Sequence, residues 1–220
     1  ANHSLDFHHP ISSVILPDGE RGQVVIAPAT EQNSVSFTFR KPSLTRFSLH
    51  DYADSGRLRG ASRASRQITD LSNAQKSMLQ LMHKDDLEPF FRLAVEQCMN
   101  ILLVGGTGSG KTTFMKAIAD LYPRKRRIFT IEDVHELALP NHPNHLHLFY
   151  KKDGVQPKTL IEACMRMKPD HVFLAELRGD EAWNYIEMLN TGHGGSITTV
   201  HANDCHSAFS RIAALVKQSA

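Results

Sequence analysis

The apolar tetrapeptide ILLV at residues 101–104 runs directly into the glycine-rich octapeptide GGTGSGKT at residues 105–112. The octapeptide fits the pattern G-x-x-x-x-G-K-[ST], and the residues after it predict a helix from about Lys111 to Leu121. A strand, a glycine-rich turn and a helix in this order are typical of a loop that binds phosphate groups. Few other local patterns restrict a fold so strongly.

Within this loop, glycines allow successive backbone N–H groups to converge on phosphates, and the helix N-terminus adds a favourable dipole. Lys111 is expected to reach the β- and γ-phosphates, Thr112 to bind Mg²⁺, and Thr113 to touch the α-phosphate. The sequence therefore predicts ATP and Mg²⁺ as cofactors. The residues predicted to bind the nucleotide are Gly105, Gly106, Thr107, Gly108, Ser109, Gly110, Lys111, Thr112 and Thr113.

The chain around the loop alternates between apolar strands and amphipathic helices. This rhythm predicts a mostly parallel sheet that is covered on both faces by helices. In such sheets ligands bind at the carboxyl ends of the strands. The strands are expected at 101–104, 128–131, 145–150, 172–175 and 196–200, and the helices at about 111–121, 157–167 and 180–190. The chemistry is then expected at residues 105–112, 132–136, 176–178 and 201–203.

Three polar groups follow predicted strands and are candidates for catalysis. Glu176 ends the strand VFLA, where a carboxylate can orient or deprotonate a water molecule or hold the water shell of a metal ion. Glu132, with Asp133 and Glu136, follows the strand IFTI, and its alternative role is in a turn or helix cap. His201 follows the strand SITTV, where it is expected to contact the γ-phosphate and report its loss.

The first part of the chain has a different pattern. Residues 14–40 alternate like a β-meander, with a turn at Pro-Asp-Gly, residues 17–19. The Gly/Ser/Arg-rich stretch at 51–67 predicts a linker, and its arginines form a solvated surface or, alternatively, a contact with a subunit or an anionic lipid. Those arginines are Arg57, Arg59, Arg63 and Arg66. Two helices follow, one capped by Ser72 and Asn73 and one preceded by a capping signature of Asp85 and Glu88.

Composition excludes some classes of protein. Lys and Arg number 25 against 23 Asp and Glu, so the net charge of +2 does not suggest a dedicated nucleic-acid binder. The three cysteines include no CxxC pair, and their odd number argues against a disulfide framework and for a reducing cytosol. No apolar run approaches the roughly 18 residues of a membrane span, so membrane association is expected to be peripheral.

A metal site is not expected at the three histidines His142, His145 and His147, which have no cysteine or acidic neighbour in sequence. They are predicted to be surface or interface residues rather than metal ligands.

Taken in order, four segments resemble the motifs of the secretion-superfamily traffic ATPases, and most closely those of the hexameric ATPases of type IV secretion systems. They are GGTGSGKT as Walker A, TIEDVHEL as the Asp box, RMKPDHVFLAELRGDEA as Walker B and TGHGGSITTVHAN as the His box. The segments LPDGERGQVVIAP and FTFRKPS are similar to the N-terminal domain of the same family. The tetracysteine zinc motif that is frequent in type II secretion relatives is absent from this sequence.

The resemblance implies a PAS-like α+β N-terminal domain linked to a RecA-like P-loop domain. The expected divisions are residues 1–50 for an N-terminal domain incomplete at its start, 51–84 for a linker and helix, and 85–220 for the ATPase domain without its C-terminal helical region. It further implies a homohexamer that works with other secretion-system components at the cytoplasmic face of the inner membrane, without sequence-specific nucleic-acid binding.

The resemblance also assigns roles to residues. Lys111 and Thr112 would bind ATP and Mg²⁺, Glu176 would act in catalysis, and Glu132 and His201 would support it. Arginines that complete the site at the γ-phosphate are expected from Arg127 or Arg124, with Arg40 and Arg46 as further candidates. Two other functions fit the motifs: a RecA-like nucleic-acid translocase, and an assembly scaffold that binds ATP but turns it over slowly. The near-neutral charge and the single tryptophan, Trp183, weaken the translocase hypothesis.

Overall fold

A computed structural model of the chain describes residues 5–41, 48–56, 71–151 and 153–218. Its elements form two sheets, with strand orders β1-β2-β3 and β4-β8-β7-β5-β6. The strands are β1 (Ile11–Ile15), β2 (Arg21–Ile26), β3 (Val35–Arg40), β4 (Ile101–Val104), β5 (Ile128–Glu132), β6 (His145–Phe149), β7 (His171–Leu174) and β8 (Ile197–Val200). The helices are α1 (Leu49–Asp54), α2 (Asn73–His83), α3 (Leu87–Glu96), α4 (Lys111–Ala119), α5 (Pro157–Met167), α6 (Glu181–Asn190) and α7 (Cys205–Gln218).

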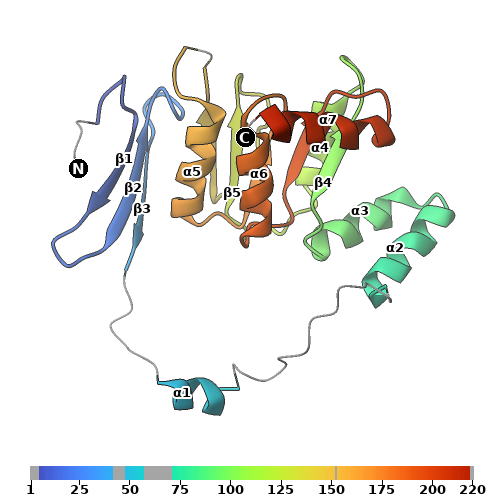
Figure 1. The fold of residues 1–220 in the computed structure, drawn as a ribbon, viewed down its shortest axis with the longest axis horizontal. Coiled ribbons are helices and arrows are strands. Elements are labelled where there is room, and N and C mark those ends of the chain that lie inside the picture. Colours follow the sequence, from blue (N-terminus) through green and yellow to red (C-terminus); the bar gives the residue numbers. More distant parts are fainter. Residues whose placement is uncertain (1–4, 42–47, 57–70, 152, 219–220) are drawn as a thin grey trace.

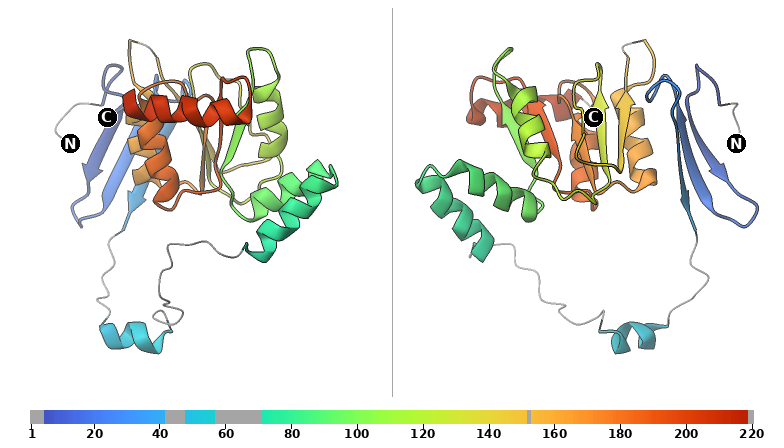
Figure 2. Two further views of the ribbon diagram at one scale, coloured as in Figure 1. Left: turned by 45° about the vertical axis from the view of Figure 1, so that its right-hand side comes forward. Right: turned by 180° about the vertical axis from the view of Figure 1, so that it is seen from behind.

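The five-stranded sheet is parallel throughout, which confirms the predicted α/β class. Helices α5 and α6 cover one face and α4 covers the other (Figures 1 and 2). Side chains alternate between the two faces along each strand. Phe129 and Ile131 of β5 therefore pack in the core beneath α5 and α6, whereas Ile128 packs in the core beneath α4. Thr130 and Glu132 share the face of Ile128, so β5 buries two polar side chains on that side.

The strand order determines which loops meet at the carboxyl edge of this sheet. Strands β8 and β7 lie between β4 and β5, although they come much later in the sequence. The loop after β4 therefore lies next to the residues that follow β8 and β7. Segments separated by as many as about a hundred positions along the chain reach one edge, because parallel strands all end on the same side.

The three-stranded sheet is antiparallel and packs beside α5, as Figure 1 shows, and Thr30, which follows β2, forms an isolated antiparallel bridge with Leu148 of the edge strand β6. Val25 of β2 and Ala29, in the connection between β2 and β3, belong to the same hydrophobic core as α5 and α6. The Thr30 hydroxyl donates a 2.8 Å hydrogen bond to the carbonyl oxygen of His147, and Arg166 donates one of 2.6 Å to the hydroxyl of Ser13. The predicted β-meander is thus present and begins a few residues earlier than predicted, at Ile11. The PAS-like character and the division at residues 1–50, 51–84 and 85–220 stay predictions.

The helix signals of the sequence were partly correct. Ser72 is the N-cap of α2, as predicted, and it forms a reciprocal capping box with Gln75, whereas Asn73 is the first residue of the helix. The capping signature at Asp85 was wrong, because α3 begins at Leu87 and Asp85 has a positive φ of 54° in the turn before it. The four linker arginines and Arg46 lie outside the described residues.

Two helices were not predicted from the sequence. Helix α1 overlaps the start of the stretch that had suggested a linker, and α7 follows the last strand. The spacing of Asp204 and Ser207 was a sequence signal for the start of α7, because such residues can cap a helix N-terminus. In the structure the Ser207 N–H donates to the Asp204 carboxylate at 2.7 Å, and the Asp204 N–H donates to the Ser207 hydroxyl at 3.1 Å. Among the described helices, none has both the length and the hydrophobicity that crossing a membrane requires.

Candidate nucleotide-binding site

The glycine-rich loop joins β4 to α4 at the carboxyl edge of the parallel sheet. Gly108 and Gly110 have φ values of 74° and 86°, which are strained for any residue with a Cβ atom. Gly110 is also the N-cap of α4, so the chain turns into the helix immediately after it. The loop therefore ends with the free backbone N–H groups of a helix N-terminus facing the site.

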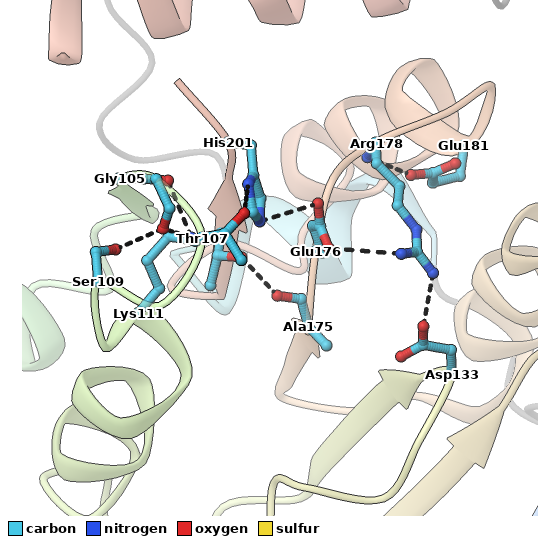
Figure 3. Close-up of polar contacts among 12 residues, drawn as sticks. Gly105, Thr107, Ser109, Lys111, Asp133, Ala175, Glu176, Arg178, Glu181 and His201 are labelled. Carbon is cyan, nitrogen blue, oxygen red and sulfur yellow. Dashed lines mark hydrogen bonds and ion pairs between the residues drawn. The ribbon is translucent and has the colours of Figure 1, made fainter. Parts of the chain in front are cut away.

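Lys111 lies folded back over this loop. Its Nζ atom donates hydrogen bonds of 2.9 Å and 2.7 Å to the carbonyl oxygens of Gly105 and Gly106. The Ser109 hydroxyl donates a further bond of 2.8 Å to the Gly106 carbonyl oxygen. The ammonium group thus lies within the loop that it is expected to help bind phosphate, as Figure 3 shows.

The loop forms one wall of an open pocket of about 490 Å³. Four segments that are far apart in sequence contribute to its lining: the glycine-rich loop with the start of α4, and the residues that follow β5, β7 and β8. This arrangement brings together most of the predicted site residues. The lining consists of Thr107, Gly108, Ser109, Gly110, Lys111, Thr112, Thr113, Glu132, Asp133, Val134, Glu136, Ala175, Glu176, Thr199 and His201.

Glu176 and His201 face one another across this pocket (Figure 3). The Nε2 atom of His201 lies 3.5 Å from Oε1 of Glu176, and its Nδ1 atom lies 3.4 Å from the hydroxyl of Thr107. His201 thereby spans the space between the glycine-rich loop and the carboxylate. The Glu176 side chain is 28% exposed, so it is accessible to a water molecule in the pocket.

Arg178 lies within the predicted range 176–178, but no role was predicted for it from the sequence. Its guanidinium donates a 2.7 Å bond to Asp133 and a 3.0 Å bond to the hydroxyl of Tyr150, and a second nitrogen lies 3.6 Å from Glu176. The hydrogen bond with Asp133 raises the pKa of Arg178 above its ordinary value. Arg178 therefore links the Walker B and Asp-box carboxylates. Its position two residues after Glu176 was the available signal.

The backbone around Arg178 is held by a buried acid. Oε1 of Glu181 accepts hydrogen bonds of 2.9 Å and 3.0 Å from the backbone N–H groups of Arg178 and Gly179. Glu181 is the first residue of α6, so its negative charge also lies at the positive end of that helix. This anchoring fixes the turn that carries both Glu176 and Arg178.

Glu132 is fully buried at the back of the pocket. Its Oε1 atom accepts bonds of 2.9 Å and 2.7 Å from the backbone N–H groups of Glu136 and Leu137, and its Oε2 atom accepts one of 2.8 Å from Thr130. Burial acts to raise the pKa of Glu132, but the nearby imidazole of His147 and these hydrogen bonds outweigh it and lower the pKa. Glu132 is thus an ionised anchor for the Asp-box loop, and this geometry combines the functional and the turn-forming roles considered from the sequence.

The structure does not bring Arg127 to this pocket. Arg127 precedes β5, at the amino end of the sheet, where its guanidinium donates to Asn144 at 2.9 Å and to Thr38 at 3.1 Å. The five residues of β5 place about 16 Å between the two edges. Arg124 lies in the same amino-edge turn, and Arg40 at the end of β3 does not line the pocket. A role for Arg127 or Arg124 at the γ-phosphate would therefore need a second subunit.

The expectation that the three histidines of residues 140–150 are surface or interface residues was wrong for two of them. His142 and His147 are buried, and His147 packs beside Thr130 of β5. An acidic partner, Glu132, also lies near His147, although it is distant in sequence. The parallel register of β5 and β6, in which Thr130 lies opposite His147, explains the difference.

The donor set of the pocket fits Mg²⁺. The hydroxyl of Thr112 and the carboxylates of Glu176 and Asp133 line the same pocket, and oxygen atoms of this kind are the ligands that Mg²⁺ prefers. Mg²⁺ in such sites is held by few protein groups together with phosphates and water. Thr112 is the residue that would bind it directly.

Comparison with known proteins supports the assignment of this pocket as a nucleotide-binding site. The family described as type II/IV secretion system protein matches residues 58–220. Type IV secretion system protein VirB11 of Brucella suis biovar 1 is 45% identical over 96% of this chain and 59% of its own length, and protein VirB11 of Agrobacterium fabrum is 36% identical over 96% and 63%. The chain thus spans about three fifths of the length of these curated relatives.

A solved structure is similar over almost the whole chain. The VirB11 ATPase from the Brucella suis type IV secretion system, solved in complex with sulphate, aligns with a TM-score of 0.91 at 45% identity. The alignment covers 99% of this chain and 65% of that one. The matched residues include all four segments that line the pocket. The chain belongs to the type II/IV secretion system protein family.

Proposed function

We propose that this chain carries the ATPase site of a hexameric motor that powers type IV secretion. The observation that supports this most directly is the pocket itself, in which Lys111, Glu176 and His201 meet although they come from three separate segments. The motor would work at the cytoplasmic face of the inner membrane, with other components of the secretion system. Turnover of ATP would move the two domains of each subunit relative to one another.

The geometry supports a division of roles during hydrolysis. The loop N–H groups and Lys111 would bind the phosphates of ATP, and Lys111 would exchange its two carbonyl partners for phosphate oxygens. Mg²⁺ held by Thr112 would supply charge neutralisation at the phosphates. Glu176 would orient the attacking water molecule and accept its proton. His201, in contact with both Thr107 and Glu176, would respond to loss of the γ-phosphate.

Two alternative functions make different predictions about the full-length protein. The motor is expected to form a hexamer in the presence of a non-hydrolysable ATP analogue and to hydrolyse ATP faster in that assembled state. Size-exclusion chromatography with light scattering, together with a phosphate-release assay, measures both. A monomer at micromolar concentration would contradict the motor. Stimulation by single-stranded DNA without assembly would favour a translocase, and a hexamer that binds but scarcely hydrolyses ATP would favour a scaffold.

We expect Arg178→Ala to reduce kcat by roughly 10- to 100-fold, because Glu176 loses the cation that orients it. The KM for ATP should change much less, since Arg178 is not among the residues that line the nucleotide pocket. Arg178 is about half exposed, so the free energy of unfolding should fall by no more than about 1 kcal/mol. Steady-state kinetics and thermal unfolding check these expectations.

Arg92→Ala is the matched control for this substitution. Arg92 also forms a 2.7 Å ion pair, with Glu88, but on the exposed surface of α3 outside the nucleotide pocket. The Arg92→Ala substitution should leave kcat unchanged. Equal kcat values for wild type and Arg178→Ala would show that Arg178 does not position Glu176.

A further inference from the structure

The side chains of Glu132, His135 and His147 lie together beside the nucleotide pocket. One potential ligand atom from each lies within 4.8 Å of those of the other two. The Nδ1 atoms of His135 and His147 lie 3.5 Å and 3.7 Å from Oε2 of Glu132, and the centres of the two imidazole rings are 4.3 Å apart. Among the described residues, this is the group of His, Cys, Asp and Glu side chains whose spacing suits a metal ion.

The two separations from Glu132 agree with tetrahedral coordination. Bonds of about 2.1 Å to a zinc-like ion place neighbouring ligand atoms roughly 3.4 Å apart. The two distances from Glu132 Oε2 are within a few tenths of an ångström of that value. Glu132 and His147 are buried and fixed, whereas the His135 side chain is 41% exposed and lies on the Asp-box loop. The three ligand atoms span up to 4.8 Å, so His135 must move toward the other two ligands to close the site, and its exposed position on the loop allows this movement.

We propose that Glu132, His135 and His147 form a binding site for a divalent transition-metal ion of the zinc class. Two imidazole nitrogens and one carboxylate oxygen favour Zn²⁺ or Co²⁺ over Mg²⁺, which prefers oxygen ligands. Three protein ligands leave a fourth position, on the exposed side of His135, for water or another small ligand.

The hydrogen bonds around the site show what the metal ion must displace. The Thr130 hydroxyl donates to Oε2 of Glu132 and accepts from the Nδ1–H of His147, both at 2.8 Å. Metal binding replaces the proton on that nitrogen, and the proton moves to the other ring nitrogen or to solvent. Thr130 keeps its bond to Glu132. The metal ion therefore competes with one hydrogen bond, which predicts moderate affinity rather than a permanently bound structural ion.

The site is connected to the nucleotide pocket through Glu132. The Oε1 atom of Glu132 holds the backbone of Glu136 and Leu137, and Asp133 and Glu136 line the pocket. A metal ion on the Oε2 atom would join this loop to β6. An effect on ATP turnover would rest on the proposed function, whereas metal binding would not, so the decisive experiment contains no nucleotide.

The experiment is a titration of the full-length protein with Co²⁺ in excess Mg²⁺, followed by the visible absorption of tetrahedrally coordinated Co²⁺ and by competition with Zn²⁺. One Co²⁺ per chain is expected, and Zn²⁺ should displace it. His135→Gln should weaken binding at least about tenfold, and so should His147→Gln. His135 is exposed, so its substitution tests the site even if His147→Gln fails to fold.

His145→Gln is the matched control. His145 lies on the same strand as His147 but outside the group of three ligands, so its substitution should leave the affinity unchanged. Absence of a Co²⁺ signal at about 100 μM, or a signal that His135→Gln does not alter, would refute the site. A signal lost instead in Cys98→Ser or Cys205→Ser, which remove exposed thiols, would assign the ion to cysteine and refute it equally.

Discussion

Lys111→Ala is expected to reduce ATP hydrolysis by at least about 100-fold, the size of effect seen when a preorganised group that stabilises transition-state charge is removed. In this structure the Lys111 ammonium group already lies over the loop, where Gly105 and Gly106 hold it. Alanine removes this charge and leaves the phosphates to backbone N–H groups alone. Steady-state phosphate release by the full-length protein measures the loss.

The fold should survive this substitution. Lys111 is the first residue of α4, and alanine is the best helix former. The two freed carbonyl groups lie on an open loop where water can replace the lost bonds, so the melting temperature should change by only a few degrees. Lys116→Ala, at an exposed position of the same helix, is the matched control and should retain full activity. Near-wild-type turnover by Lys111→Ala would exclude the proposed nucleotide site.

Glu176→Gln separates binding of ATP from its hydrolysis. The amide has nearly the same shape as the carboxylate but cannot accept a proton from water, so kcat should fall by about 100-fold or more. Binding of a fluorescent ATP analogue should stay within about threefold of wild type, because Lys111 and the loop N–H groups are intact. The kcat and the affinity for the ATP analogue are both measured on the full-length protein.

Glu187→Gln controls for the change of charge, since Glu187 is exposed on α6 outside the pocket. Unimpaired hydrolysis by Glu176→Gln would move the role of general base to another residue. The structure makes Glu132 a poor substitute, because both of its oxygen atoms already accept hydrogen bonds from Glu136, Leu137 and Thr130.

Much of the site was predictable because its residues either belong to one contiguous loop or directly follow strands of a parallel sheet. The glycine-rich loop is a contiguous segment, so its residue types alone predict how the backbone turns. Glu176 and His201 were placed correctly at the sheet edge because each follows an apolar strand, and parallel strands end at a common edge. Arg127 does not reach the pocket of its own chain, because the whole of strand β5 lies between Arg127 and the pocket although Arg127 and Glu132 are close in sequence.

What the sequence by itself determined is the α/β class, the phosphate-binding loop and the edge of the sheet at which the chemistry lies. Only the tertiary structure decided which side chains touch. The pairing of Arg178 with Asp133 depends on the strand order, and the approach of His147 to Glu132 depends on the register of β5 and β6. Order and register result from packing between elements distant along the chain, whereas the pattern of a single strand or loop carries no information about its neighbours.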